Sequence, residues 1–303
     1  MLDIKRILFA TDFSEGAERA FPWAVSLATL HGAALHMLHT IALYDADPAL
    51  PVEHYRVLER LYERMVEHAE ERMRSAARES APPELVIQMS QLRGIAPAEA
   101  ILDYMLQSDI DLAVLGSHGH RGVRKLLLGS VSAEVARLAH CPVLIVGRER
   151  APHIRRILVP LDLSEVSDVG LEHALELAAG LGASVLLLHV VEVQGYLDFY
   201  FPQPAEEYFD LARLRRDAIE RLLQRARDVA GHDVPVDADA LVAHPVEGIR
   251  DVAEKRGADL ILMASHGHSG HQPALIGSVA NGVLRHAPCP VMIVKAFGKS
   301  LLP

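Results

Sequence analysis

The sequence has few of the features that mark secreted or membrane proteins. Only two of its 303 residues are cysteine, at matching points of the two halves, in Cys141-Pro142 and Cys289-Pro290. A cysteine just before an apolar strand is expected to be a small buried side chain, not part of a disulfide framework. No apolar run is long enough for a membrane helix, and the first residues lack the pattern of a signal peptide. We therefore expect a cytoplasmic chain without a membrane partner.

Positive charge and aromatic side chains are also scarce. Residues 1–150 carry 16 Lys and Arg against 20 Asp and Glu, and the remaining residues carry 14 against 20. Both halves are therefore mildly acidic, whereas binding to nucleic acid phosphates needs a basic face. Nucleic acid is not an expected partner. Aromatic residues make up 5% of the chain, so the core should be aliphatic and rich in alanine.

The chain contains the same pattern twice. The segment from Arg6 to Ser14 matches the segment from Arg156 to Ser164 at an offset of 150 residues. The segment Cys141-Pro142-Val143 matches Cys289-Pro290-Val291 at an offset of 148. An offset that changes by only two residues across a whole half indicates an internal duplication. The predicted domains are residues 1–148 and 154–303, linked by residues 148–153.

Apolar runs alternate with helical patterns in each half. In the first half the runs are residues 5–11, 34–40, 84–90, 111–116 and 142–147. Their apolar residues are continuous, as in strands that are buried on both faces. An amphipathic pattern covers residues 54–80, and its counterpart covers about 205–230. The predicted fold class is α/β: two tandem doubly wound domains, each a five-stranded parallel sheet flanked by about four helices (Rossmann-like).

Helix boundaries can be predicted at four positions. Ser14 and Ser164 directly follow the first apolar run of each half, where an N-cap residue is expected. Gly32 and Gly182 stand where the next helix should end.

A repeated glycine loop is the main functional signal. Gly116-Ser117-His118-Gly119 is followed after nine residues by Gly129-Ser130, and Ala264-Ser265-His266-Gly267 is followed after nine by Gly277-Ser278. Glycine permits close backbone approach and positive φ, and a helix N-terminus attracts anions. The loop therefore suits a phosphate chain at the carboxyl ends of the strands. It is neither a Walker loop nor a dinucleotide motif.

The combined motifs resemble the universal stress protein family: an Asp after the first strand, Gly-x2-Gly-x9-Gly-Ser, and Cys-Pro-Val before the last strand. The resemblance implies an adenine nucleotide alpha hydrolase-like fold that binds ATP, or AMP or ADP, with magnesium as an optional companion. It implies that tandem halves pack like a dimer of single domains; a further homodimer stays open. The family positions correspond here to Asp12, Ile41, Gly116, Gly119, Gly129 and Ser130, and in the second half to Asp162, Val191, Gly267, Gly277 and Ser278.

The two loops are not equal. Ala264 replaces the first glycine, which costs about 1 kcal/mol if that position requires a positive φ. No Lys or Arg occurs between Gly267 and Arg285, whereas the first loop carries Arg121, Arg124 and Lys125. These three cations either meet phosphate or form a solvated face. One nucleotide site is therefore expected in the first half, and a second site is in question.

Other interpretations compete with nucleotide binding. Asp12 and Asp162 could be simple turn residues. The loop histidines, which are His118, His120, His266, His268 and His271, have His-x-His spacing but no nearby cysteine or clustered carboxylate, so no metal site is predicted. Residues 42–54 and 192–206, with aromatic residues at 196–201, instead favour a scaffold that binds an apolar molecule or a protein. No nucleophile elbow or kinase motif is found. We expect a regulatory protein without turnover, with slow ATP hydrolysis left open.

Overall fold

The computed structural model describes residues 2–41, 52–119, 128–147, 151–192, 210–229, 233–267, 276–296 and 298–302. In the first half the elements are β1 (Arg6–Thr11), α1 (Glu15–His31), β2 (Ala34–Ile41), α2 (Val52–Ser80), β3 (Ile87–Arg93), α3 (Pro97–Gln107), β4 (Leu112–Gly116), α4 (Ser130–Leu138) and β5 (Val143–Val146). In the second they are β6 (Arg156–Pro160), α5 (Glu165–Leu181), β7 (Ser184–Val191), α7 (Leu211–Asp228), β8 (Val236–Val242), α8 (Pro245–Lys255), β9 (Leu260–Ala264), α9 (Ser278–His286) and β10 (Val291–Val294).

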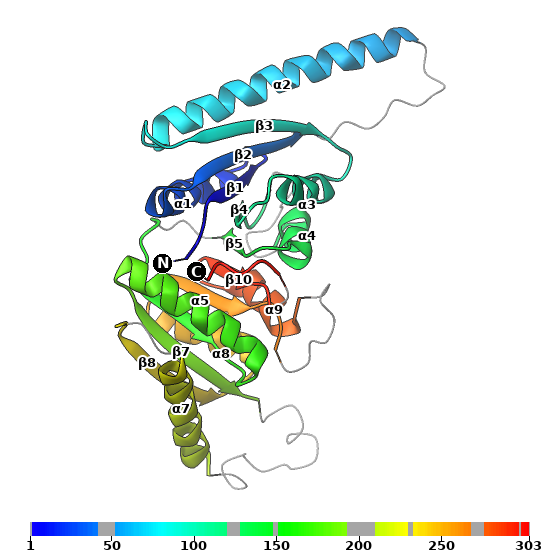
Figure 1. The fold of residues 1–303 in the computed structure, drawn as a ribbon. Coiled ribbons are helices and arrows are strands. Elements are labelled where there is room, and N and C mark those ends of the chain that lie inside the picture. Colours follow the sequence, from blue (N-terminus) through cyan, green and yellow to red (C-terminus); the bar gives the residue numbers. More distant parts are fainter. Residues whose placement is uncertain are drawn as a thin grey trace, which may run out of the picture.

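All ten described strands form one sheet, in the order β3-β2-β1-β4-β5-β10-β9-β6-β7-β8. Each half is a parallel, doubly wound set of five strands, which confirms the predicted fold class. The halves join where β10 pairs with β5 in the antiparallel direction, with Met292 opposite Leu144. Figure 1 shows this sheet running through the molecule, with α2 at one end and α7 at the other.

The sheet carries one core layer on each face. One layer extends under α1, α2, α5 and α7 and contains Trp23, Met37 and Leu222. The other extends under α3, α4, α8 and α9 and contains Met105, Val135 and Ile261. Both layers include residues of both halves, so the hydrophobic contact is continuous across the β5–β10 junction. The two cysteines are buried and unbridged. Among the helices that the structure describes, no helix is both long and apolar enough to cross a membrane.

Local sequence signals set the helix ends as predicted. The Ser14 Oγ accepts a hydrogen bond from the Ala17 N–H at 3.3 Å, and the Ser164 Oγ accepts one from the Ser167 N–H at 3.2 Å. Gly32 and Gly182 end α1 and α5 with φ of 62° and 64°. These left-handed values favour glycine.

Two elements differ from the sequence prediction by more than one or two residues. The third strand covers Ile87–Arg93 and not residues 84–90, because the Leu85 N–H closes a turn onto the Pro82 carbonyl at 3.0 Å. The helix expected over about 205–230 covers Leu211–Asp228. Residues 205–209 and 230 lie outside the described residues.

The last residues of the chain hold the two halves together. Buried Lys295, just after β10, donates from Nζ to the carbonyls of Ala136 and Arg137 at the end of α4. Burial lowers the pKa of this ammonium to about 8. Lys299 forms ion pairs with Asp109 and Asp111 of the first half.

Leu301 completes this connection between the halves. Its side chain is fully buried. Its N–H donates to Nε2 of His173 at 3.1 Å, and its carbonyl accepts from the Asp3 N–H at 2.8 Å. The final residues therefore touch α5 and the N-terminal segment at once.

His173 should make the stability of the protein depend on pH. Its Nδ1 bonds to the Val169 carbonyl at 2.7 Å, so its Nε2 is the acceptor for Leu301 and the ring is neutral. Burial, only partly opposed by that carbonyl and by Glu176, lowers the pKa of His173 below its ordinary 6.5. Below about pH 6.5 this histidine binds more protons in the unfolded chain than in the folded chain. The contribution of His173 to stability should therefore be constant above about pH 6.5 and decrease as the pH falls further.

Urea unfolding between about pH 7.5 and about pH 5 tests this expectation. His173→Asn should be less stable at neutral pH but should lose less stability on acidification than the parent. His68→Asn, a change at an exposed position of α2, should leave the pH dependence as it was. Equal pH slopes in the parent and in His173→Asn would contradict the assignment.

Candidate functional site

The strand order reverses at two equivalent places. In the first half β1 pairs with β2 on one side and with β4 on the other, and in the second half β6 pairs with β7 and with β9. Connections leave these neighbouring strands toward opposite sides, which opens a crevice at their carboxyl ends. Asp12 follows β1 and Gly116 ends β4, so the predicted residues meet at this point.

A tight turn fixes each aspartate at the mouth of the crevice. The Asp12 Oδ1 accepts from the Ser14 N–H at 3.0 Å, and the Asp162 Oδ1 accepts from the Ser164 N–H at the same distance. Between each pair stands a non-glycine residue with positive φ, Phe13 at 61° and Leu163 at 65°. Such conformations cost about 1 kcal/mol or more. The same costly turn occurs in both halves and aims both carboxylates in the same way.

The second glycine of each loop lies directly against one of these carboxylates. A Cβ added to Gly119 would lie 2.2 Å from the Asp12 Oδ2, and one added to Gly267 would lie 1.9 Å from the Asp162 Oδ2. A side chain at either position would force the carboxylate to move. Asp12 and Gly119, and likewise Asp162 and Gly267, therefore lie together at the crevice.

The first glycine has a steric role and not the conformational one considered from the sequence. None of the loop glycines that the structure describes, nor Ala264, has a positive φ, so the penalty proposed for Ala264 does not arise. A Cβ on Gly116 would instead lie 2.5 Å from the backbone of Gly16 in α1. Gly16 itself approaches the His118 carbonyl just as closely, at 2.2 Å from an added Cβ.

In the second half a different glycine allows the helix to pack closely against the strand end. Val166 occupies the position that matches Gly16, and Ala264 the position that matches Gly116. The close approach moves one turn along the helix, to Gly170, whose added Cβ would lie 3.0 Å from the Ala264 nitrogen. Ala264 is therefore a compensated exchange, which sequence comparison of the loops alone does not reveal.

Each loop ends at the N-terminus of a helix without a side-chain cap. Gly129 precedes α4 and Gly277 precedes α9, and neither makes a side-chain capping bond. Their own N–H groups bond back to the Ser117 and Ser265 carbonyls, at 2.6 and 2.8 Å. The first-turn N–H groups that follow, beginning at Ser130 and Ser278, have no partner within the helix and suit an anion.

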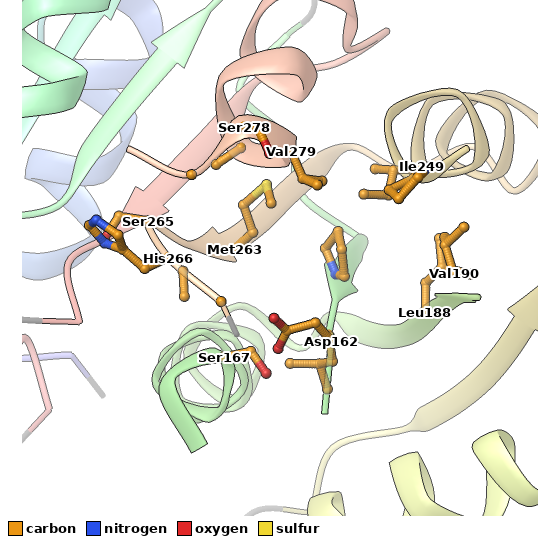
Figure 2. Close-up of a pocket in the computed structure, with 17 residues that line it drawn as sticks. Asp162, Ser167, Leu188, Val190, Ile249, Met263, Ser265, His266, Ser278 and Val279 are labelled. Atoms are coloured by element: carbon orange, nitrogen blue, oxygen red, sulfur yellow. The ribbon is translucent and has the colours of Figure 1, made fainter. Parts of the chain in front are cut away.

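The second-half crevice contains a cavity of about 150 Å³. Figure 2 shows Asp162 and Ser167 on one side, Ser278 and Val279 opposite them, and Met263 between. Leu188, Val190 and Ile249 line one end, and Ser265 and His266 line the other. The second-half positions Asp162, Gly267, Gly277 and Ser278 all line this cavity.

The two strand-end residues expected beside the base occupy different surroundings. Ile41 is buried at the end of β2. Val191 ends β7, while its neighbour Val190 is the residue that lines the cavity. Consecutive residues of a strand point to opposite faces, so an assignment by spacing alone is sensitive to a shift of one position.

The histidines at the ends of β2 and β7 orient the turn residues. Nδ1 of His39 lies 2.8 Å from the Thr11 carbonyl, and Nδ1 of His189 lies 2.8 Å from the Leu161 carbonyl. The His39 ring also packs against Phe13 in a tilted arrangement, at 4.5 Å between ring centroids, and burial lowers the pKa of His39. Among described residues, no group of three His, Cys, Asp or Glu is placed to hold a metal. Arg121, Arg124, Lys125, His120, His268, His271 and the aromatic residues at 196–201 lie outside the described residues.

Several cavity residues were not identified from the sequence. Pro245 and Ile249 come from α8, and Ser167 from α5. Pro245 repeats Pro97 and Ile249 repeats Ile101 at the offset of 148. This recurrence is a signal that could have identified them, because both prolines begin a helix beside the crevice.

The fold and this site define a class: a tandem α/β protein, adenine nucleotide alpha hydrolase-like, with one strand-end crevice in each half. The sequence profile of the Universal stress protein family matches residues 3–147 and again 153–295. The chain belongs to the universal stress protein family, as a member with two family domains.

The chain is also similar to several known proteins. A universal stress protein of Mycolicibacterium smegmatis is 28% identical, with 95% of this chain and 96% of that protein covered. The solved structure of a universal stress protein from Archaeoglobus fulgidus superposes with a TM-score of 0.69 at 23% identity, over 96% of this chain and 98% of that chain. A universal stress protein solved in complex with cAMP has a TM-score of 0.35 at 20% identity, over 48% of this chain and 98% of that chain.

Proposed function

We propose that this protein binds adenine nucleotides, ATP or its relatives, and acts by changing state or recruiting partners and not by turnover. The observation that carries the proposal is a convergence found in both halves. A fixed carboxylate, a glycine that it contacts and an uncapped helix N-terminus meet where the strand order reverses. Such crevices bind nucleotides in open α/β sheets.

Each part of the crevice suits a different part of a nucleotide. In the second half, apolar side chains of Leu188, Val190 and Ile249 form a surface for a base. Carboxylates in the positions of Asp12 and Asp162 can accept hydrogen bonds from ribose hydroxyls. The first turns of α4 and α9 can receive a phosphate on backbone N–H groups. Ser130 and Ser278 add a hydroxyl at the same ends.

Titration calorimetry with ATP on the full chain tests the proposal. We expect Asp12→Ala to weaken the first-half site by about 10- to 100-fold, since a charged hydrogen bond contributes about 1.5–3 kcal/mol. Asp162→Ala should affect the second-half site in the same way. Glu84→Ala, at an exposed carboxylate before β3, is the control and should leave binding unchanged.

A failure of the parent protein to bind nucleotide would contradict the proposal. If the parent protein bound no adenine nucleotide at millimolar concentration, nucleotide binding would be excluded. A lipid or other apolar molecule found with the purified protein by native mass spectrometry would then favour the scaffold interpretation, because the walls of the second-half cavity are largely apolar.

A further inference from the structure

The two crevices differ in chemistry at matching positions. From the first half to the second, Thr11 becomes Leu161 and Thr40 becomes Val190. Ser132, whose Oγ donates to the Gly116 carbonyl at 2.6 Å, becomes Ala280. Leu161, Val190 and Ala280 all line the second-half cavity. Each of these three exchanges removes a hydroxyl, whereas the exchange of Ala17 for Ser167 adds one. At the compared positions the second crevice therefore has fewer side-chain hydroxyls than the first.

The described lining of the second cavity also lacks Lys and Arg. Its seventeen described lining residues include neither Lys nor Arg, but they do include Asp162. The segment that joins Gly267 to Gly277 contains no Lys or Arg in its sequence. It therefore supplies no permanent positive charge, whatever its conformation.

Lys295, which acts on the cavity residue His266, is already engaged elsewhere. Lys295 lies close enough to His266 to add to the lowering of that imidazole's pKa, which is mainly due to burial. However, the Lys295 Nζ donates to the Ala136 and Arg137 carbonyls of the first half. These bonds direct its charge toward α4, and Lys295 is not among the cavity's lining residues.

The group in this cavity that can bind an anion is the N-terminus of α9. The first turn of α9, with the Ser278 hydroxyl, can hold one phosphate group. A second or third phosphate would add negative charge near Asp162, and no Lys or Arg among the described lining residues would offset it.

We propose that the second-half cavity selects an adenine nucleoside or nucleoside monophosphate, and that β- and γ-phosphates add no affinity there. This inference rests on the proposed nucleotide-binding function. It makes the two halves unequal in ligand class, with polyphosphate binding confined to the first half.

The test uses the full chain with one site blocked at a time. Gly119→Val, whose side chain would displace the Asp12 carboxylate, leaves the second-half site, and Gly267→Val leaves the first. Adenosine, AMP and ATP are titrated into each variant at about pH 8, where histidines of ordinary pKa are neutral, with and without magnesium. Circular dichroism confirms folding, and Asp12→Ala, at an exposed position, replaces Gly119→Val if the valine is not tolerated.

The expected result for the second-half site is AMP binding that ATP does not exceed. Tighter binding of ATP than of AMP at this site, or no binding of any of the three ligands, would overturn the inference. If the proposed nucleotide-binding function itself is wrong, the result is different: the parent chain will bind neither adenosine, AMP nor ATP at either site.

A gain of charge gives an independent test. Val279→Lys places an ammonium at the first turn of α9, at a half-buried position that lines the cavity. In the Gly119→Val background it should raise the affinity for ATP relative to AMP by about fivefold, the size expected for one partly exposed charge pair. Val279→Met is the matched uncharged control. An unchanged ATP-to-AMP ratio in the lysine variant would count against the charge argument.

Discussion

Replacing Gly116 by alanine is expected to destabilise the protein by about 1–3 kcal/mol, the usual cost of overpacking a tight contact. The added methyl would lie 2.5 Å from backbone atoms of Gly16. Backbone atoms cannot rotate away as a side chain can, so α1 must shift. The N-terminus of α1 carries Ser14 and, through it, the carboxylate of Asp12. Binding at the first-half site should therefore weaken together with stability.

Urea unfolding and nucleotide titration measure both effects of Gly116→Ala. Gly94→Ala is the matched control, because its added Cβ meets only ordinary contacts, at 3.5 Å from the Ala100 Cβ. If the two variants were equally stable, the close approach of α1 would not be rigid. Ala264→Gly should not improve binding in the second half, because that position does not need a positive φ.

Replacing Leu301 by alanine should cost about 2–5 kcal/mol, as for other fully buried leucines. The side chain belongs to the core layer that extends under α1 and α5. Its backbone bonds to His173 and to Asp3 would also be weakened if the segment moved. Because the segment contacts both halves, we expect one lowered unfolding transition and not the loss of one half alone.

Leu302→Ala provides the comparison for this second variant. Leu302 is only half-buried beside the same core layer, so its truncation should cost clearly less. Thermal unfolding of both variants, monitored by circular dichroism, gives the ranking. A Leu301→Ala protein as stable as the parent would show that the final residues do not hold the halves together.

Most of the fold could be predicted because local signals and the duplication agree. Buried parallel strands have continuous apolar runs, and the serine and glycine caps act through their own neighbours in sequence. The third strand was placed three residues early because Leu85 and Val86 extend the apolar run backward, although a turn at Pro82 holds Leu85 outside the strand.

The contacts that favour glycine at each loop position could not be predicted in the same way. Spacing identified Gly116 and Gly119, but their neighbours Gly16 and Asp12 lie about a hundred residues away in sequence. The exchange at Ala264 looked harmful for the same reason, because its compensation at Gly170 is visible only once α5 is packed on β9. The tertiary contact, and not the loop sequence, decides which residue is allowed.

The antiparallel pairing of β5 with β10 has a consequence for how the two sites can evolve. In a homodimer of single domains, any substitution appears in both subunits, so the two sites stay identical. Here the paired units are encoded separately in one chain and do not dissociate on dilution. Thr40 and Val190, or Ser132 and Ala280, can therefore diverge independently. Covalent linkage therefore allows the two halves to acquire different ligand specificities within a single continuous sheet.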